Sequence, residues 1–266
     1  MNSRLHHLRG LATAVLSLGL LSASASATVL LTETFDYPDN TTLNGAGGWS
    51  TSYTSPGTPF VVKGGSLDLT SSAGASVREF SATAISSGSL YYGFDFSLST
   101  ASDSLNGSYF ATLASAPTSG VIRTQQGKLF VKNSGAGYLI GVTASATTST
   151  VQYGSAVFDF GDVHRVVVGY NFVDGLANNT ASVYVDGNLL ASAVWDTTPE
   201  VSLIGFILTH TSTSSSKPLP DSFDNLTVAT TYAEAAATAA VPEPSAYAAI
   251  LGGLALAGVV LRRRRA

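Results

Sequence analysis

Two carboxylates occupy positions where the strand pattern predicts side chains that face a core. Glu33 shares its parity along the chain with Leu31 and Phe35. Asp224 shares its parity with Leu226. An inward carboxylate is costly unless it is paired or binds a metal. If the first and last strands are neighbours, Ca²⁺ would accept both groups, so we expect a structural calcium site; the alternative is that Glu33 lies at a rim and caps backbone amides.

Aromatic side chains offer a second kind of chemistry. Trp49 follows the glycine-rich stretch 45–48, and Tyr91 lies on the polar side of an alternating segment. Flat sugar faces stack on such rings, whose amphipathic character suits wet binding sites. We therefore predict Trp49 and Tyr91 as ligand contacts. The alternative for Trp49 is that its ring folds back and plugs one end of the core.

Groups for hydrolysis are sparse. A glycoside hydrolase with its acids on one strand needs closely spaced carboxylates, but the glutamates of the central region are scattered at 33, 79, 200 and 234. A serine hydrolase needs a histidine base, yet His164 and His210 are the histidines beyond the first 27 residues, and Gly-x-Ser-x-Gly is absent. We expect no enzyme. A divergent glycoside hydrolase that pairs acids across strands, for example Asp68, Glu79 or Asp95, stays open.

Composition narrows the class of protein. The 266 residues contain no Cys, which excludes disulfides and thiolate catalysis. Six of the 13 Lys and Arg and one of the 17 Asp and Glu lie in the two terminal segments, so the remainder has a net charge of −9. No basic surface is expected, which argues against a nucleic-acid partner.

Period-two alternation predicts one antiparallel β domain over residues 28–231, most clearly at 89–98, 163–172 and 179–186. Tight turns are expected at Gly64-Gly65, Gln126-Gly127 and Asp186-Gly187. Short strands without helical crossovers favour a two-sheet jelly-roll sandwich. The further strands expected are 29–35, 60–63, 67–70, 76–80, 108–113, 121–124, 129–132, 189–195, 201–208 and 224–229.

Residues 1–27 have the features of a signal peptide. Arg4 and Arg9 precede the apolar stretch 11–21, and Ala25-Ser26-Ala27 forms an A-x-A cleavage site. The mature chain is then expected to begin at Thr28, and an uncleaved anchor is the alternative.

The C-terminal end has three parts after an Ala-rich linker at 232–241. They are Pro242-Glu243-Pro244, an uncharged apolar run at 246–261, and the cluster Arg262, Arg263, Arg264 and Arg265. Sixteen helical residues span about 24 Å, so a transmembrane helix with its arginines in the cytoplasm is expected. The alternative is that this segment is a plain C-terminal membrane anchor with no further role.

This arrangement resembles the PEP-CTERM sorting signal of Gram-negative bacteria, with residues 242–266 as the signal. The resemblance implies an exosortase partner, a membrane-embedded Cys peptidase that cleaves near Pro242-Glu243-Pro244. It also implies export, a transient inner-membrane anchor, and delivery to the cell surface or to the extracellular exopolysaccharide matrix.

The central domain has a second resemblance. The runs 164–170 and 181–187, the latter ending in Asp186-Gly187, are similar to the late hairpin of concanavalin-A-like (laminin-G-like) jelly rolls. In that fold the first and last strands pair. The function expected is a surface or matrix protein whose sandwich contacts exopolysaccharide or matrix glycans. A purely structural or adhesive protein without a small ligand is the alternative.

Overall fold

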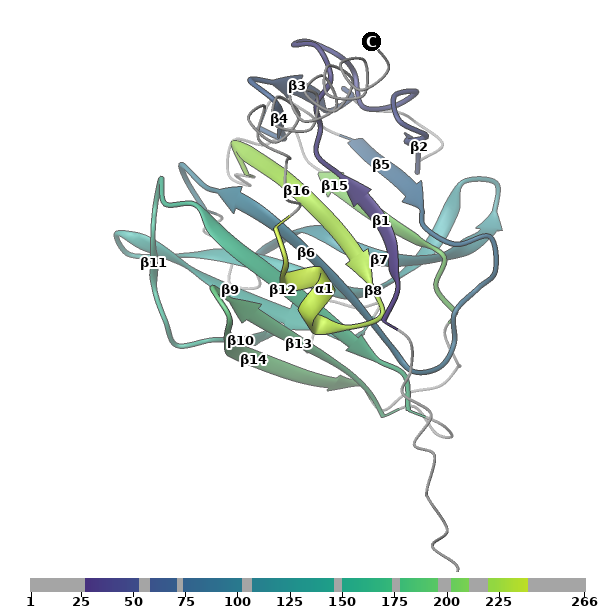
Figure 1. The fold of residues 1–266 in the computed structure, drawn as a ribbon. Helices are drawn as coiled ribbons and strands as arrows, with labels where there is room; N and C mark the ends of the chain where they lie inside the picture. Colours follow the sequence, from purple (N-terminus) through teal and green to yellow (C-terminus); the bar gives the residue numbers. More distant parts are fainter. Residues whose placement is uncertain are drawn as a thin grey trace, which may run out of the picture.

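The computed structural model describes residues 27–52, 58–70, 74–101, 107–145, 150–173, 178–195, 202–210 and 220–238. Over these residues the chain is almost entirely β-structure and forms two antiparallel sheets in a sandwich (Figure 1). The predicted all-β, two-sheet sandwich is confirmed. Its closer assignment to the concanavalin-A-like jelly rolls stays a prediction. The sorting motif and almost all of the signal peptide lie outside the described residues.

One sheet, called sheet A, contains the first and last strands side by side, as expected. Its order is β14 (Asn188–Trp195), β13 (Asn179–Val185), β12 (His164–Asn171), β6 (Ser89–Ser97), β16 (Ser222–Ala229), β4 (Ser66–Asp68) and β3 (Val61–Lys63), with β1 (Val29–Glu33) also paired to β16.

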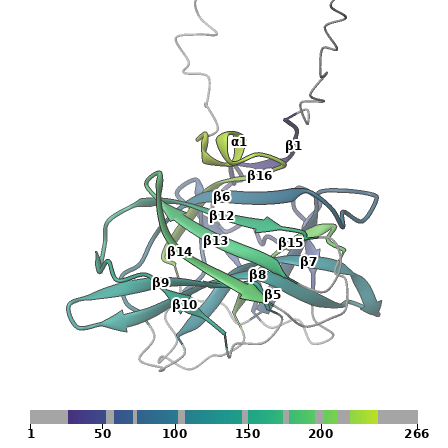
Figure 2. The ribbon, with the colours of Figure 1, turned by 90° about the horizontal axis from the view of Figure 1, so that it is seen from below.

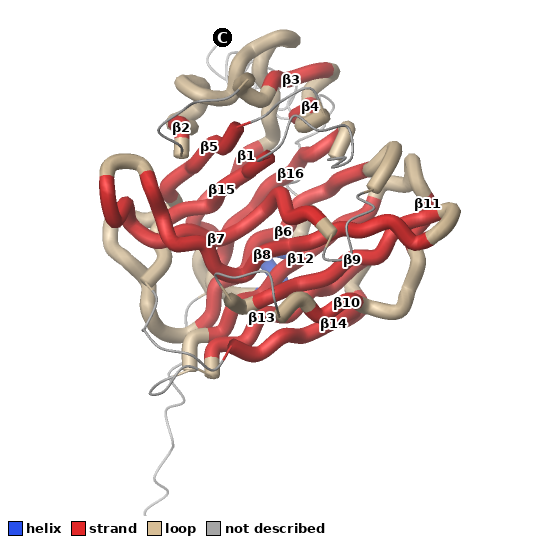
Figure 3. Tube along the Cα trace, turned by 180° about the vertical axis from the view of Figure 1, so that it is seen from behind, coloured by secondary structure: helices blue, strands red, loops and turns tan. Residues whose placement is uncertain are grey.

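The other sheet, sheet B, lies behind sheet A in the view of Figure 1 and in front in Figure 3. Its order is β10 (Gln152–Tyr153), β9 (Gly137–Thr143), β8 (Ile122–Ser134), β7 (Ser108–Ser119), β15 (Gly205–His210), β5 (Gly74–Glu79) and β2 (Ser50–Thr51), with β11 (Phe158–Asp159) paired to β9.

Alternation along the strands produces the core between the sheets. In β6, Leu90, Tyr92, Phe94 and Phe96 are fully buried, as their common parity predicts. Phe94 stacks on Phe223 of β16 with ring centroids 4.3 Å apart. Large aromatic side chains therefore fill the space between the two layers, and their burial is the main stabilising term for such a sandwich.

Two of the three expected tight turns are present. Gly64 and Gly65 have φ of 62° and 77° between β3 and β4. Asp186 and Gly187 have φ of 49° and 84° between β13 and β14. Positive φ at both central residues is the requirement of the hairpin turn whose twist matches its strands.

The prediction of the third turn, at Gln126-Gly127, is wrong. Gly127 lies inside β8, which joins the two strands expected at 121–124 and 129–132. The pairing with β7 shifts register beside it, and Gly127 has φ of 59°, as in a glycine bulge. Its carbonyl accepts a hydrogen bond from the Tyr92 hydroxyl at 2.7 Å. A Gln-Gly pair has the same local sequence pattern in a bulge as in a turn, so the pairing with the neighbouring strand decides which of the two forms.

The expected linker also begins differently. Tyr232–Ala236 form the short helix α1, which lies against the outer face of sheet A, away from sheet B (Figure 2). Thr28 lies beside Thr230 through paired hydrogen bonds of 3.0 Å. The described chain therefore begins and ends at one side of the sandwich. No helix among the described residues is long and apolar enough to cross a membrane.

Candidate functional site

Glu33 is a buried carboxylate that accepts three hydrogen bonds from protein donors. Its Oε1 accepts from the backbone N–H of Phe35 at 3.0 Å. Its Oε2 accepts from the Tyr37 hydroxyl and from the Trp49 indole Nε1, each at 2.9 Å. Burial and the bond to Glu33 raise the pKa of Tyr37 to about 12, so its hydroxyl stays a donor. These donors satisfy the carboxylate without a cation.

Asp224 lies on the other side of sheet A from Glu33. Glu33 is in register with the core residue Leu226, whereas Asp224 is opposite Asp95 on the outer face. Between Asp224 and Leu226, Asn225 has φ of 53° where the pairing shifts register. This bulge reverses the parity used in the prediction. The expected calcium site on Glu33 and Asp224 is therefore contradicted by the geometry of this pair.

The described residues offer no other cluster for a metal. They contain no group of three or more His, Asp or Glu side chains that could hold an ion. Glu33 and Asp224 lie on opposite sides of sheet A and do not fit one shared calcium ion.

Trp49 is a core residue. Its side chain is 2% exposed, and its ring lies 6.4 Å from that of Phe206 and 6.1 Å from that of Phe35. The prediction that Trp49 offers a face to a ligand is contradicted, and the core-plug alternative describes its position. Its only polar atom is used on Glu33.

Tyr91 points outward and is half-buried. Its ring lies 6.3 Å from the ring of Tyr232 in α1. It also covers Gly169 of β12, where a Cβ would come within 2.7 Å of the ring. Tyr91 thus packs between helix and sheet, and its role as a ligand contact stays a prediction.

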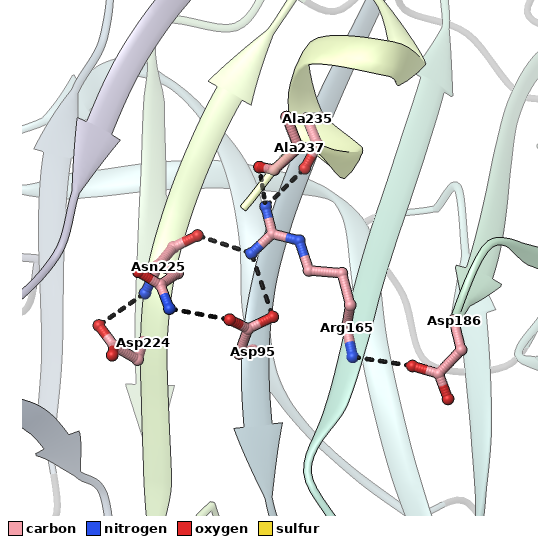
Figure 4. Close-up of polar contacts among 7 residues, drawn as sticks. All are labelled: Asp95, Arg165, Asp186, Asp224, Asn225, Ala235 and Ala237. Carbon is pink, nitrogen blue, oxygen red and sulfur yellow. Dashed lines mark hydrogen bonds and ion pairs between the residues drawn. The ribbon is translucent and has the colours of Figure 1, made fainter. Parts of the chain in front are cut away.

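Arg165 of β12 joins three elements on the outer face of sheet A (Figure 4). Its Nη2 donates to the carbonyls of Ala235 at 2.7 Å and Ala237 at 2.9 Å, at the end of α1. Its Nη1 donates to the carbonyl of Asn225 at 2.8 Å and lies 3.4 Å from Oδ1 of Asp95. Carbonyls at a helix end lack intrahelical donors, and the guanidinium supplies them.

Asp95 and Asp224 form the kind of cross-strand acid pair that the sequence left open. They are directly opposite each other on β6 and β16. Burial raises the pKa of Asp224 to about 6, with the nearby Asp95 adding to the effect. Asp95 itself accepts from the Asn225 amide at 2.8 Å and pairs with Arg165. The two acids thus differ in environment, as acid and base partners in hydrolysis do.

Sheet B presents a different chemistry on its outer face. Lys128, Phe130 and Lys132 lie on one side of β8, because alternate residues of a strand share a face. The Lys128 Nζ is 4.6 Å from the ring centroid of Tyr109 on β7. The Lys132 Nζ is 4.1 Å from the ring centroid of Tyr153 on β10. Two cations therefore lie on aromatic faces across four neighbouring strands, which Figure 3 shows side by side.

Two further contacts join these residues into one cluster on the outer side of sheet B, called the Lys–Tyr face and defined by Tyr109, Lys128, Phe130, Lys132 and Tyr153. Phe130 is 1% exposed and lies at its buried centre. The ring centroids of Tyr109 and Phe130 are 5.3 Å apart. Tyr153 lies over Gly141 of β9, where a Cβ would come within 2.7 Å of its ring. Gly141 therefore lets the Tyr153 ring lie flat across the sheet.

Burial acts strongly on one of the two cations. Lys128 is 4% exposed, and desolvation lowers its pKa to about 8. Such a lysine is close to neutral at mildly alkaline pH, and an anion beside it would favour its charged form. Tyr109, Lys132 and Tyr153 are only half-buried.

The Lys–Tyr face was not predicted from the sequence. A signal exists in the alternation Lys128-Leu129-Phe130-Val131-Lys132, which is unusual in a chain with 13 Lys and Arg. Tyr109 comes from β7, which pairs with β8, and Tyr153 comes from β10, which lies one strand further away beyond β9.

Residues 240–265 match the family of PEP-CTERM protein-sorting motifs. The motif marks the chain as an exported protein that an exosortase sorts to the cell surface. No curated protein matches the chain.

Three solved structures have a similar fold. The globular domain of T. cruzi calreticulin is 12% identical, with 79% of this chain and 91% of that chain covered and a TM-score of 0.46. The alginate lyase Aly36B is 14% identical, with 74% and 95% covered and a TM-score of 0.47. An endo-β-1,4-glucuronan lyase from the fungus Trichoderma reesei is 16% identical, with 76% and 98% covered and a TM-score of 0.42.

Proposed function

We propose that the sandwich contacts an acidic polysaccharide of the cell surface or matrix through the Lys–Tyr face of sheet B. The observation that carries this proposal is the placement of Lys128 and Lys132 on the rings of Tyr109 and Tyr153. The region between the two terminal signals has a net charge of −9, so two lysines on one face are a local exception that would attract anions.

The chemistry of the face suits carboxylated sugars. Lysine ammonium groups pair with carboxylates through charge-assisted hydrogen bonds. Tyrosine rings supply flat apolar surface with a polar edge. The two lysines are four residues apart on β8, about 13 Å along the strand, which favours a polymer over a single sugar.

Binding to polysaccharides of opposite charge type tests the proposal. A protein of residues 28–238, which retains α1, is titrated with alginate and polygalacturonate as acidic polymers and with laminarin and cellulose as neutral ones. We expect binding to the acidic polymers only, weakened by 0.5 M salt because screening shortens electrostatic attraction.

The double variant Lys128→Met, Lys132→Met should bind acidic polymers at least about tenfold more weakly, as for the loss of two charge-assisted contacts. Lys63→Met is the matched control, because Lys63 is a lysine with a 75% exposed side chain on β3 of sheet A. Equal binding of acidic and neutral polymers, or an unchanged double variant, would contradict the proposed face. Absence of all glycan binding would leave the structural or adhesive alternative.

The acid pair of Asp95 and Asp224 supports a second candidate, a divergent glycoside hydrolase. Burial raises the pKa of Asp224 to about 6, toward the range of a general acid. The network with Arg165 and Asn225 instead binds Asp95 into the fold, which favours contact over catalysis. Purified protein should release no sugar from laminarin, cellulose, xylan or agarose, and release abolished by Asp224→Asn would establish the hydrolase.

A further inference from the structure

The folded chain is fastened to sheet A immediately before the sorting motif. Arg165 holds the carbonyl of Ala237 at 2.9 Å, and only residues 238–241 separate Ala237 from Pro242. The fastened helix is thus a direct neighbour, along the chain, of the segment that a sorting peptidase has to bind.

Three independent features hold α1 in place. The first is the Arg165 guanidinium, which bonds two carbonyls at the helix end. The second is Gly93 of β6, where a Cβ would lie 2.1 Å from the carbonyl oxygen of Ala235. The third is apolar packing of the fully buried Ala235 on Val167 and Ala229. Helix and sheet therefore fit each other as a built contact.

Docking sets the reach of the sorting motif. An extended chain spans at most about 3.6 Å per residue, so Pro242 lies within about 18 Å of Ala237 while α1 is docked. Release of the helix moves the last fixed residue back to Thr231. The reach then rises to about 40 Å.

A peptidase commonly binds its substrate as an extended strand, by main-chain hydrogen bonds over several residues. Residues 236–241 are the natural substrate positions on the N-terminal side of Pro242-Glu243-Pro244, and the first two of them are tied to α1 and Arg165. A docked helix thus keeps part of this stretch out of the extended form and brings the bulk of the sandwich close to the bond.

We propose that α1 controls processing of the sorting signal: the docked helix shields the motif, and its release from sheet A precedes cleavage. Arg165 is then a positioning residue that acts on the reaction through α1. This inference rests on the processing that the sorting motif implies and is independent of glycan binding. When release is a fast pre-equilibrium, the cleavage rate follows the released fraction.

Pulse-labelling of the full-length protein in its host measures the conversion of precursor to product. Arg165→Leu should shorten the half-time of conversion roughly tenfold, since it raises the released fraction of α1. Gly93→Ala should act in the same direction by steric expulsion of α1. Arg123→Leu is the matched control, because it removes a buried arginine from sheet B, where Arg123 pairs with Glu79 at 2.6 Å, without contact to α1; its half-time should equal that of the wild type.

A spacer variant distinguishes an effect of the motif's reach from an effect of a less stable fold. Insertion of Gly-Ser-Gly-Ser after Thr238 lengthens the chain between α1 and Pro242 and leaves the contacts of Arg165 with α1 intact. Processing should therefore accelerate, and Arg165→Leu in the spacer variant should increase the rate of conversion only a little further. Unchanged or slower conversion in both Gly93→Ala and the spacer variant would overturn the inference. Replacement of Pro242-Glu243-Pro244 by alanines identifies the motif-dependent product: conversion that persists in that variant would instead contradict sorting itself.

Discussion

The outer faces of the two sheets use their cations in opposite ways. On sheet A, Arg165 pairs with Asp95 and donates to three backbone carbonyls, one in β16, one in α1 and one just after α1. On sheet B, Lys128 and Lys132 lie on tyrosine rings. A guanidinium fork fits several fixed acceptors at once, whereas an ammonium is a compact charge with three rotatable donors. The cation of the first face stabilises the fold, and the second face is the one that we propose as a contact surface.

The largest effect is expected from Arg165→Leu. The change leaves Asp95 without its cation and removes donors from the carbonyls of Ala235 and Ala237, so the free energy of unfolding should fall by about 3 kcal/mol. Urea unfolding measures it. Arg165→Lys should lose less, about 1–2 kcal/mol, because it keeps the charge but not the fork. A loss equal to that of an exposed lysine variant would mean that the network does not serve the fold.

Gly93→Ala tests the same face without a change in charge. Because the new methyl group would meet the backbone of Ala235, α1 has to shift, and we expect a loss of about 2 kcal/mol. Amide hydrogen exchange should accelerate over residues 232–237 and stay slow in β8. Protection that persists in α1 would show that the sheet yields instead of the helix.

Lys128→Met tests the opposite face and should stabilise the fold. The folded state lowers the pKa of Lys128 from 10.5 to about 8. Between these values the unfolded chain binds more protons, so wild-type stability rises with pH. The variant should therefore gain about 1–2 kcal/mol at pH 7, with the gain vanishing above pH 10.5. Thermal melts at pH 7 and pH 10 measure it, and destabilisation at pH 7 would assign Lys128 to the scaffold.

The smallest effect is expected from Asp224→Asn. The folded state raises the pKa of Asp224 from 3.8 to about 6, so the wild type loses stability as the pH rises through this range. Asparagine avoids the charge beside Asp95. After allowance for solvent at this half-buried position, the variant should gain about 1 kcal/mol above pH 6 and nothing below pH 3.8. Equal melting curves at pH 7 would mean that Asp224 carries no such cost.

Regular strands and tight hairpins of this fold follow from the sequence. The inward row of β6 and the turns at Gly64-Gly65 and Asp186-Gly187 were predicted because their signals are local. The two bulges were not predicted, since a bulge at Gly127 or Asn225 is defined only by the register of the partner strand. One extra residue at Asn225 was enough to turn Asp224 to the other face.

The candidate sites depend even more than the bulges on contacts between residues that are far apart in the sequence. Residues 232–236 are too few to form a helix alone, so the sequence predicts only a linker at 232–241. The helix is held by Arg165, which lies 70 residues before Ala235. The Lys–Tyr face likewise needs Tyr109 from β7 and Tyr153 from β10, and no spacing in the sequence indicates that these strands lie on either side of β8 and β9. The prediction of an exposed Trp49 was wrong because its indole N–H finds a hydrogen-bond acceptor, Glu33, inside the core.

The position of β16 has a consequence for export. This last strand is not an edge: it lies between β6 and β4 and also pairs with β1. Sheet A therefore cannot close until residue 229 has emerged from the translocation channel, when nearly the whole region before the C-terminal apolar run is across. Until then sheet A lacks the strand that joins β6 to β4 and β1. Completion of sheet A thus depends on the last part of the domain to emerge, because the long-range pairing that completes it involves the strand β16.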